Sequence, residues 1–346
     1  MTHPLSDSYC TTFNESKPPI PYSPGQEVWV RPHDPPPPTK GSRALTRDTA
    51  KERASKHPVE RCLLHPPLRG GSIASTVIRL KILETIRVED GQNAQLVVVQ
   101  ASSHITPNNS NAPPSDRCLV AKFYDPLYFD HEQDDADPFL CTDYYYTHEV
   151  AAYKALDPLQ GTIIPKYYGS YTCELPILGG NQRSVRLILM EAVKGNSMQH
   201  LKPTDFSQSE RQNIMKAIID AESSLYSHDV SHGDLHPRNI LVSGSATAIS
   251  TLRVILIDFG NARLGRAPIW ATPEEKQKYL PGIPISPLLR WNKAWWCDRQ
   301  IVFDEWIDWD WQPWLEYHWS AGAFITAEMV SIWLPSYLTA PPRPPP

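Results

Sequence analysis

Residues 230–242 read Val-Ser-His-Gly-Asp-Leu-His-Pro-Arg-Asn-Ile-Leu-Val, and the fold assignment starts from this stretch. A polar loop with Asp234 and Asn239 leads into an apolar run, and Ile-Asp-Phe-Gly follows at 257–260. Carboxylate and amide oxygens are the hard ligands that Mg²⁺ prefers. The stretch therefore predicts a carboxylate, Asp234, that accepts a proton or orients a hydroxyl, beside two metal ligands, Asn239 and Asp258.

The flanking segments predict how these residues meet. Apolar runs at 240–242 and 253–257, separated by a polar loop, predict a hairpin that brings Asp258 beside Asn239. Upstream, Ser207 and Glu210 have the spacing of a helix capping box. The helix that they open has apolar residues on one face, at Ile214, Ile218, Ala221 and Leu225.

The N-terminal half has the pattern of a small antiparallel sheet. The predicted strands are 78–82, 95–100, 118–124, 163–171 and 185–191. A helical segment, 144–156, lies among them, and the acidic stretch 125–137 reads as a solvated loop. The sheet and helix together predict an α+β domain in which one helix packs on the strands.

Lys122 lies in the third of these strands, in Leu-Val-Ala-Lys. Taken alone, it could be an exposed lysine on an edge strand. A buried lysine needs a partner of opposite charge, and Glu149 on the helical segment is a candidate. A Lys–Glu pair of this kind orients the ammonium toward the α- and β-phosphates of ATP.

Five residues thus occur in an order that suits phosphoryl transfer, each on the type of segment that its role needs. They are Lys122, Glu149, Asp234, Asn239 and Asp258. We predict Asp234, Lys122 and Glu149 as catalytic residues. Lys122, Asn239 and Asp258 would bind the nucleotide, with Asn239 and Asp258 holding Mg²⁺.

Four motifs carry a family resemblance over about residues 72–337: Lys-Phe-Tyr-Asp-Pro, Pro-Lys-Tyr-Tyr-Gly, His-Gly-Asp-Leu-His-Pro-Arg-Asn-Ile and Trp-Ile-Asp-Trp-Asp-Trp-Gln. The chain resembles protein-kinase-like phosphotransferases. It looks closest to the kinase-like proteins common in fungi, and has features of aminoglycoside and choline phosphotransferases. The resemblance implies a two-lobed kinase-like fold with an N-lobe at 72–190, a mainly helical C-lobe at 191–338, and ATP and Mg²⁺ as cofactors.

The order of motifs also favours a hinge where the strand 185–191 runs into Ala-Val-Lys-Gly. Adenine would then pair with backbone groups near Glu191 and Val193, with Met190 lining its pocket. An ordinary buried strand followed by a turn explains the same apolar run.

Three positions depart from the protein-kinase pattern. The loop that covers phosphate in protein kinases has three glycines, and here only Gly91 precedes Gln-Asn-Ala. Gly233 stands where many protein kinases have an arginine that reads a phosphorylated activation loop. His236 stands where serine/threonine kinases have a lysine for the γ-phosphate. These departures favour an atypical protein kinase or a small-molecule kinase.

The two ends of the chain are rich in proline, of which there are 35 residues. We expect residues 1–71 and 339–346 to be disordered, because proline-rich polar sequence forms neither helices nor central strands. A partner that binds the proline-rich tail is the alternative to plain disorder.

Composition excludes several function classes. The net charge of −5 gives no electrostatic basis for nucleic-acid binding, and no apolar run is long enough for a membrane span. The six cysteines are scattered without a Cys-x-x-Cys pair, which predicts reduced thiols in a cytoplasmic or nuclear protein.

Residues 291–333 hold nine of the eleven tryptophans. They predict a packed helical core with aspartates on its surface. A carbohydrate- or cation-binding aromatic site is the alternative.

The function predicted from the sequence is transfer of the γ-phosphate of Mg-ATP to a hydroxyl acceptor, either a protein or a small molecule. The alternative is a pseudokinase that binds nucleotide or partners without turnover, which the single-glycine loop favours. A third hypothesis is a scaffold that acts through its proline-rich tail.

Overall fold

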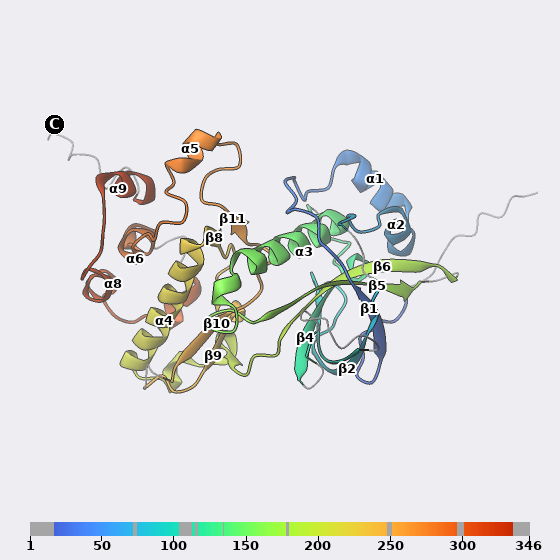
Figure 1. The fold of residues 1–346 in the computed structure, drawn as a ribbon, viewed down its shortest axis with the longest axis horizontal. Helices are drawn as coiled ribbons and strands as arrows, with labels where there is room; N and C mark the ends of the chain where they lie inside the picture. Colours follow the sequence, from blue (N-terminus) through green and yellow to red (C-terminus); the bar gives the residue numbers. More distant parts are fainter. Residues whose placement is uncertain are drawn as a thin grey trace, which may run out of the picture.

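The computed structural model describes residues 17–71, 75–103, 113–114, 117–133, 135–177, 180–247, 251–295 and 301–334. A strand-rich part and a mainly helical part lie side by side (Figure 1). The sheets within the described ranges are antiparallel, so the chain has the mixed α+β architecture that the sequence predicts.

Six antiparallel strands close into a barrel in the strand-rich part. They are β1 (Glu27–Pro32), β2 (Ile78–Arg87), β3 (Gln95–Ser103), β4 (Cys118–Tyr124), β5 (Tyr167–Pro176) and β6 (Gln182–Glu191). Their order around the barrel is β1-β2-β3-β4-β6-β5, and β1 closes the ring by pairing with both β2 and β5. The sequence predicted five of these strands, but it predicted neither β1 nor the closure.

The prediction that residues 1–71 form a disordered tail is wrong for the part that the structure describes, 17–71. In β1, Val28 and Val30 point into the barrel core, whereas Trp29 between them is half exposed. This two-residue alternation folds because β2 and β5 each offer an unpaired strand edge, and pairing satisfies the backbone groups of all three strands. Residues 1–16 and 339–346 lie outside the described residues.

Two short helices, α1 (Arg47–Ser55) and α2 (Pro58–Leu64), lie within the predicted tail. Arg61 on α2 is fully buried, and its Nε lies 3.0 Å from Glu52 of α1. Its Nη2 lies 3.7 Å from Asp137. These charges stabilise the fold by pairing with one another, which composition alone does not reveal.

Helix α3 (Pro138–Ala155) begins six residues earlier than predicted. The side chain of Asp137 caps it by accepting hydrogen bonds from the backbone N–H groups of Phe139 and Leu140, and Pro138 occupies the first turn. A capping aspartate and an early proline are a typical helix start. The first turn is buried as well, because Phe139 packs in the core cluster of the barrel, whereas Val150 and Tyr153 belong to the cluster that includes α4.

The acidic stretch 125–137 is not simply a solvated loop. Asp125 is buried, and both of its carboxylate oxygens accept hydrogen bonds from Arg183 of β6, at 2.7 and 3.2 Å. The Tyr22 hydroxyl donates a third, at 2.7 Å. A buried carboxylate with a bidentate arginine partner links the N-terminal segment, β4 and β6.

The helical part is built around α4 (Gln208–Ser227), whose capping box of Ser207 and Glu210 confirms the predicted helix start. Its other elements are β7 (Asn196–Ser197), β8 (Val230–Ser231), β9 (Ile240–Ser243), β10 (Arg253–Leu256), β11 (Arg263–Leu264), α5 (Pro273–Gln277), α6 (Pro287–Arg290), α8 (Trp311–Trp319) and α9 (Ala327–Trp333). The predicted hairpin is present as β9 and β10, and β7 pairs with β9. The chain thus passes from the barrel to the helical part between Glu191 and Asn196.

The tryptophan-rich segment packs as a core. Trp291, Trp306, Trp311 and Trp314 are each at most 8% exposed and belong to the same apolar cluster as the inner face of α4. Large aromatic side chains contribute much buried area, so the packed-core prediction is confirmed for these residues.

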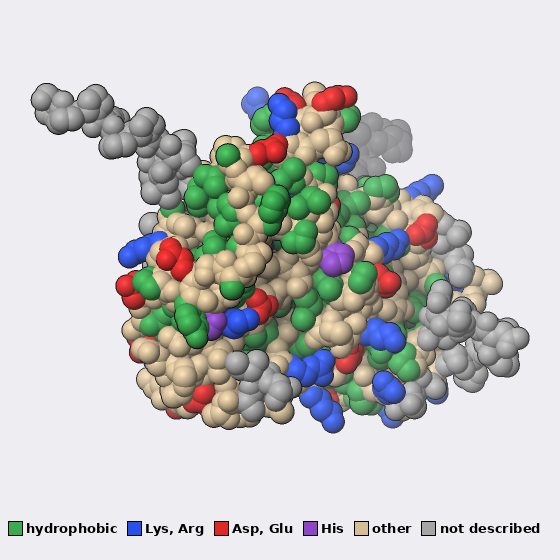
Figure 2. Space-filling model, turned by 60° about the vertical axis from the view of Figure 1, so that its left-hand side comes forward, with side chains coloured by type: hydrophobic (Ala, Val, Ile, Leu, Met, Phe, Trp, Pro, Cys, Tyr) green, Lys and Arg blue, Asp and Glu red, His purple; other side chains and the backbone are tan. Residues whose placement is uncertain are grey.

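The face shown in Figure 2 carries acidic and basic side chains that are interspersed. Apolar side chains gather near the top of this face, close to the projecting α5. In the described ranges, none of the helices combines the length and the apolar character that crossing a bilayer requires.

Candidate functional site

Lys122 lies on β4, which is paired on both sides, by β3 and β6. Its side chain is buried, and the Nζ atom lies 2.6 Å from Oε2 of Glu149 and 2.8 Å from Oδ1 of Asp258. The alternative of an exposed edge lysine is therefore wrong. Three residues that are far apart in the sequence meet at one ammonium group.

Glu149 reaches this point from α3 and is fully buried. Its Oε2 also accepts a hydrogen bond of 2.6 Å from the Tyr124 hydroxyl. Tyr124 is two residues beyond Lys122 on β4, so both side chains project to the same face of the strand. Sequence reasoning missed Tyr124, although its i+2 spacing from the lysine was a usable signal.

Lys122 and Asp258 hold each other ionised, whereas burial outweighs the charge of Lys122 at Glu149 and raises the pKa of that carboxyl. Burial lowers the pKa of Lys122, but Asp258 and Glu149 outweigh burial, and the pKa is raised above its usual value. Burial raises the pKa of Asp258, but the charge and hydrogen bond of Lys122 outweigh it and lower that pKa to about 2. The stabilisation from Asp258 is therefore present above the usual carboxyl pKa and is lost as the pH falls toward about 2. The stabilisation from Lys122 is complete below its usual pKa and is lost only in strong alkali, so both charges persist through neutral pH.

Asp258 follows β10 in an unusual backbone conformation, with φ of 65°. Non-glycine residues at positive φ are strained and cluster at functional sites. Ile257, just before it, donates its N–H to the Asn239 carbonyl at 3.0 Å. This bond places Asp258 next to the loop of Asn239, as the predicted hairpin required.

His232 stabilises the loop that carries Asp234. This side chain is buried, and its Nε2 lies 2.9 Å from the Ile257 carbonyl oxygen, so it donates a hydrogen bond there. Burial lowers the pKa of His232, which keeps the ring neutral near pH 7. The ring also packs on Phe259, with 4.9 Å between the centroids. The loop and the segment around Asp258 are thereby locked together.

Asp234 itself is partly exposed and has two partners. Arg238 donates from Nη2 to both carboxylate oxygens, at 2.6 and 2.8 Å. Asn239 donates from Nδ2 to the Asp234 Oδ2 atom at 3.0 Å and to its carbonyl at 2.9 Å. Because the amide nitrogen of Asn239 is used here, its oxygen is the atom left for a cation. Arg238 was not singled out from the sequence, although it stands inside the central motif.

Gly233 has a conformation that only glycine adopts easily. Its φ is 76°, and a Cβ atom built on it would lie 1.9 Å from the carbonyl oxygen of Asn261. An arginine at this position would meet the same obstacle. The departure from the protein-kinase pattern is thus a steric requirement of this loop.

We expect Gly233→Ala to destabilise the protein strongly. Gly322→Ala is the matched control, because Gly322 has the same φ of 76° but no heavy atom within 4 Å of the added Cβ. The control should lose about 1–2 kcal/mol from backbone strain alone, and Gly233→Ala about 1–3 kcal/mol more from overpacking. Urea unfolding of both variants measures the difference. Equal losses would show that Asn261 imposes no steric requirement.

A cavity of about 150 Å³ lies between the two parts of the chain, at Lys122. Lys122, Asp234 and Asp258, three of the five residues predicted for phosphoryl transfer, line it. Gln92 and Asn93, from the turn between β2 and β3, line it as well. Three of the predicted site residues therefore face one space. Gln92 and Asn93 follow Gly91, so the turn that contains this glycine borders the cavity. This turn corresponds to the phosphate-covering loop of the sequence analysis.

The residues predicted for adenine are not among those that line this cavity. Met190 is buried, and its sulfur lies 3.7 Å from the Tyr153 hydroxyl. The Val193 N–H donates to the Glu191 carbonyl at 3.1 Å, and the Glu191 N–H donates to the Lys166 carbonyl at 2.8 Å. Both hinge groups predicted to face adenine thus have backbone partners, and their role stays a prediction.

A segment of the predicted tail reaches the site. The guanidinium of Arg43 lies 4.2 Å from the ring centre of Tyr144 on α3 and donates to the Asn261 side chain at 3.3 Å. His148, next to Glu149, lies between the carbonyl oxygens of Thr39 and Ala262, at 3.1 and 2.8 Å. The segment therefore ties α3 to the chain just after Asp258. Sequence reasoning missed it because its composition indicated disorder.

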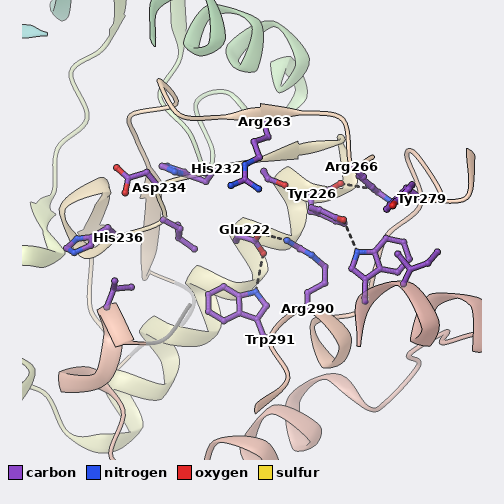
Figure 3. A pocket seen from close by; sticks show the side chains of 16 residues that line it. Glu222, Tyr226, His232, Asp234, His236, Arg263, Arg266, Tyr279, Arg290 and Trp291 are labelled. Atoms are coloured by element: carbon purple, nitrogen blue, oxygen red, sulfur yellow. Dashed lines mark hydrogen bonds and ion pairs between the residues drawn. The ribbon is translucent and has the colours of Figure 1, made fainter. Parts of the chain in front are cut away.

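A larger pocket of about 670 Å³ opens on the other side of Asp234, within the helical part (Figure 3). It lies between the C-terminal end of α4, the short strands β8 and β11, and helices α6 and α9. Volumes of 300–1,000 Å³ are typical of small-molecule sites. Asp234 thus separates two spaces, the cavity at Lys122 and this pocket.

The sequence Thr-Pro-Glu at 272–274 begins the short helix α5. Thr272 caps α5, and Glu274 is exposed. Thr-Pro-Glu is therefore a helix start on the surface.

Comparison with known proteins agrees with the motifs. The family model described as protein kinase domain matches residues 144–279. A curated protein from fowlpox virus (strain NVSL), described as a probable serine/threonine-protein kinase, is 30% identical over 116 residues. That alignment covers 34% of this chain and 36% of the viral protein, so the chain spans about a third of the length of this relative.

Proposed function

We propose that this protein is an ATP-dependent phosphotransferase that moves the γ-phosphate of Mg-ATP to a hydroxyl group. The observation that carries the proposal is the contact of Lys122 with both Glu149 and Asp258, at 2.6 and 2.8 Å. Such a lysine, fixed by a helix glutamate beside a metal-binding aspartate, is what phosphoryl transfer by a kinase requires. The match to the protein kinase domain supports the same activity.

Each residue has a proposed role in this reaction. Lys122 binds the α- and β-phosphates, and Glu149 with Tyr124 holds its ammonium in place. Asp234 orients the acceptor hydroxyl and accepts its proton. The donor set fits a magnesium ion, since the Asp258 carboxylate and the Asn239 amide oxygen are hard ligands. Bound there, the ion would neutralise charge on the transferring phosphate.

The remaining nucleotide contacts follow the sequence prediction. Backbone groups of Glu191 and Val193 would pair with adenine, and Met190 would line its pocket. Because both N–H groups donate within the protein, the carbonyl oxygens of these residues are the groups open to adenine without a change of backbone partner. We also propose that the chain is most similar to the kinase-like proteins common in fungi, with His-Gly-Asp at 232–234 as in aminoglycoside- and choline-type kinases.

The nucleotide site is tested by the melting temperature with and without Mg-ATP. Ligand at about 100 times its dissociation constant stabilises the fold by roughly 2.7 kcal/mol, a rise of a few degrees for a chain of this size. We expect Asp258→Ala to abolish the rise. Asp229→Ala is the control, because Asp229 also has a positive φ and an ion pair, with Arg266, yet does not line the cavity at Lys122.

The control should melt lower than the wild type and keep the Mg-ATP shift. A shift that survives Asp258→Ala, or no shift in the wild type at millimolar Mg-ATP, would contradict the proposed site.

A pseudokinase is the second candidate, and the turn at Gly91 favours it. The Gly91 N–H donates to the Tyr128 carbonyl at 3.0 Å, so this backbone donor is used inside the protein. Fewer amides are then free to cover phosphate. Release of ADP from Mg-ATP separates the two candidates, because a pseudokinase would show the thermal shift without turnover.

A further inference from the structure

The pocket of Figure 3 extends away from the proposed catalytic base. Asp234 lies at one end and Arg266 at the other, with Arg263 and Arg290 between them. The pocket is far larger than the reach of a serine or threonine side chain toward Asp234 would need. Its volume, about 670 Å³, suits a whole small molecule.

The lining carries a positive charge. Three arginines face two carboxylates, Glu222 and Asp234. The lining histidines do not add to this positive charge, because burial lowers the pKa of His232, and burial with the charge of Arg238 lowers that of His236. The surplus of one positive charge in a partly desolvated space attracts an anion.

Arg290 supplies a buried donor without a partner. The side chain is 2% exposed, and its Nη2 pairs with Glu222 while the guanidinium lies 3.6 Å from the ring centre of Tyr226. Its Nη1 atom has no hydrogen-bond partner among the residues that the structure describes. A buried guanidinium nitrogen without an acceptor is costly. An anionic group in the pocket would satisfy it.

Arg263 supplies an accessible cation close to the reacting end. It lies on β11 opposite Ser231, three residues before Asp234, and its side chain points into the pocket in Figure 3. Across the described ranges, it has neither an ion pair nor a side-chain hydrogen bond. Arg266, in contrast, is engaged by Asp229 at 2.7 Å. Arg263 is therefore the arginine best placed to bind a ligand.

The walls are aromatic. Trp291 donates from Nε1 to Glu222 at 3.1 Å, and Trp333 donates to the Tyr226 hydroxyl at 2.8 Å. Their polar atoms are thus used inside the protein, and both residues line the pocket. Such walls exclude water and pack on a carbon skeleton.

We infer that this pocket binds the acceptor and selects a small hydroxyl compound that carries an anionic group, a carboxylate or a phosphate. This inference rests on the phosphotransferase function proposed above. The hydroxyl lies at Asp234, and the anion lies between Arg263 and Arg290. In the reaction, the acceptor oxygen forms a bond to the γ-phosphorus while the bond from that phosphorus to the β-phosphate oxygen breaks. The hydroxyl proton passes to Asp234, ADP leaves, and the anionic group does not react.

The test measures ADP release from Mg-ATP by the full chain, with two matched sets of acceptors. One set is glycerol, glycerate, glycerol phosphate and serinol; the other is glucose, glucuronate, glucose phosphate and glucosamine. Within each set the skeleton is constant and the charge varies. We expect the anionic members to stimulate ADP release above the rate with water, and the carboxylate and phosphate members to show which anion is preferred.

The variant Arg263→Gln should raise the KM for the anionic acceptor by about tenfold to hundredfold, the value of a lost charge-assisted hydrogen bond. Arg253→Gln is the control, because Arg253 is also an exposed strand arginine but lies on β10, outside the pocket lining. Stimulation only by uncharged or cationic members, stimulation by none, or an unchanged KM in Arg263→Gln would overturn the inference. The Mg-ATP thermal shift and the release of ADP with water as acceptor are measured on the same protein, so loss of either identifies a failure of the phosphotransferase proposal instead.

Discussion

Replacing Asp234 by asparagine is expected to lower the rate of ADP release from Mg-ATP by about 10²–10⁴-fold, the usual contribution of a positioned general base. Asparagine keeps the size of the side chain and an oxygen that can accept from Arg238, but it cannot take the proton of the acceptor. The KM for ATP should change little, because the nucleotide contacts come from Lys122 and Asp258. The rate with saturating Mg-ATP and water as acceptor is the measurement.

Stability should hardly change in this variant. The Asp234–Arg238 pair is substantially exposed, with 29% and 44% of the two side chains accessible, and such pairs contribute about 0–1 kcal/mol. Asp220→Asn is the matched control, because Asp220 also pairs with a basic residue four positions away, Lys216 at 2.6 Å. It should leave both rate and stability near those of the wild type. Turnover by Asp234→Asn at the wild-type rate would mean that Asp234 is not the base.

Asp234 and its neighbours could be predicted because their signal is local. The residues from His232 to Asn239 predict a loop. The hairpin that follows returns the chain to this loop and so brings Asp258 beside Asn239. Lys122 and Glu149 were predictable as a pair because a lysine in an apolar strand is costly without a carboxylate. The contact between Lys122 and Asp258 follows once both are in the fold.

The barrel closure was not predictable in the same way. Only Val28 and Val30 mark β1, and prolines surround them. Their burial depends on two strands that lie some fifty and more than a hundred residues further along the chain. Read locally, the proline-rich composition of this segment indicates disorder, and two alternating valines are too weak a signal to change that. In the folded chain, the segment forms a strand because β2 and β5 each offer an unpaired edge.

The acceptor pocket illustrates the same limit at the site. Arg263 and Arg290 belong to separate short elements, and nothing in their spacing indicates that they face one space. The pairing of Arg290 with Glu222 of α4 joins residues that are 68 positions apart. The tryptophans were predicted as core, and they are, but Trp291 also serves as a wall of the pocket.

The largest stability effect is expected for Lys122→Met. Glu149 is fully buried, and the ammonium of Lys122 supplies the opposite charge next to its carboxylate. Removing one partner of a buried ion pair costs about 3–5 kcal/mol, because the other charge is left uncompensated. Methionine keeps the volume and the apolar stem, so the loss reports charge and not packing. Urea unfolding at neutral pH gives the free energy of unfolding.

Lys81→Met is the control, because Lys81 lies exposed on β2 of the same barrel; its loss should stay within about 0.5 kcal/mol. The double variant Lys122→Met/Glu149→Gln should recover part of the stability, since it removes the charge that Lys122→Met leaves buried. Recovery would establish that Lys122 and Glu149 act as a pair, which is the arrangement that phosphate binding needs. If the losses of the two single variants simply add, the 2.6 Å contact contributes nothing specific, and the proposed role of Glu149 in holding Lys122 toward the nucleotide is wrong.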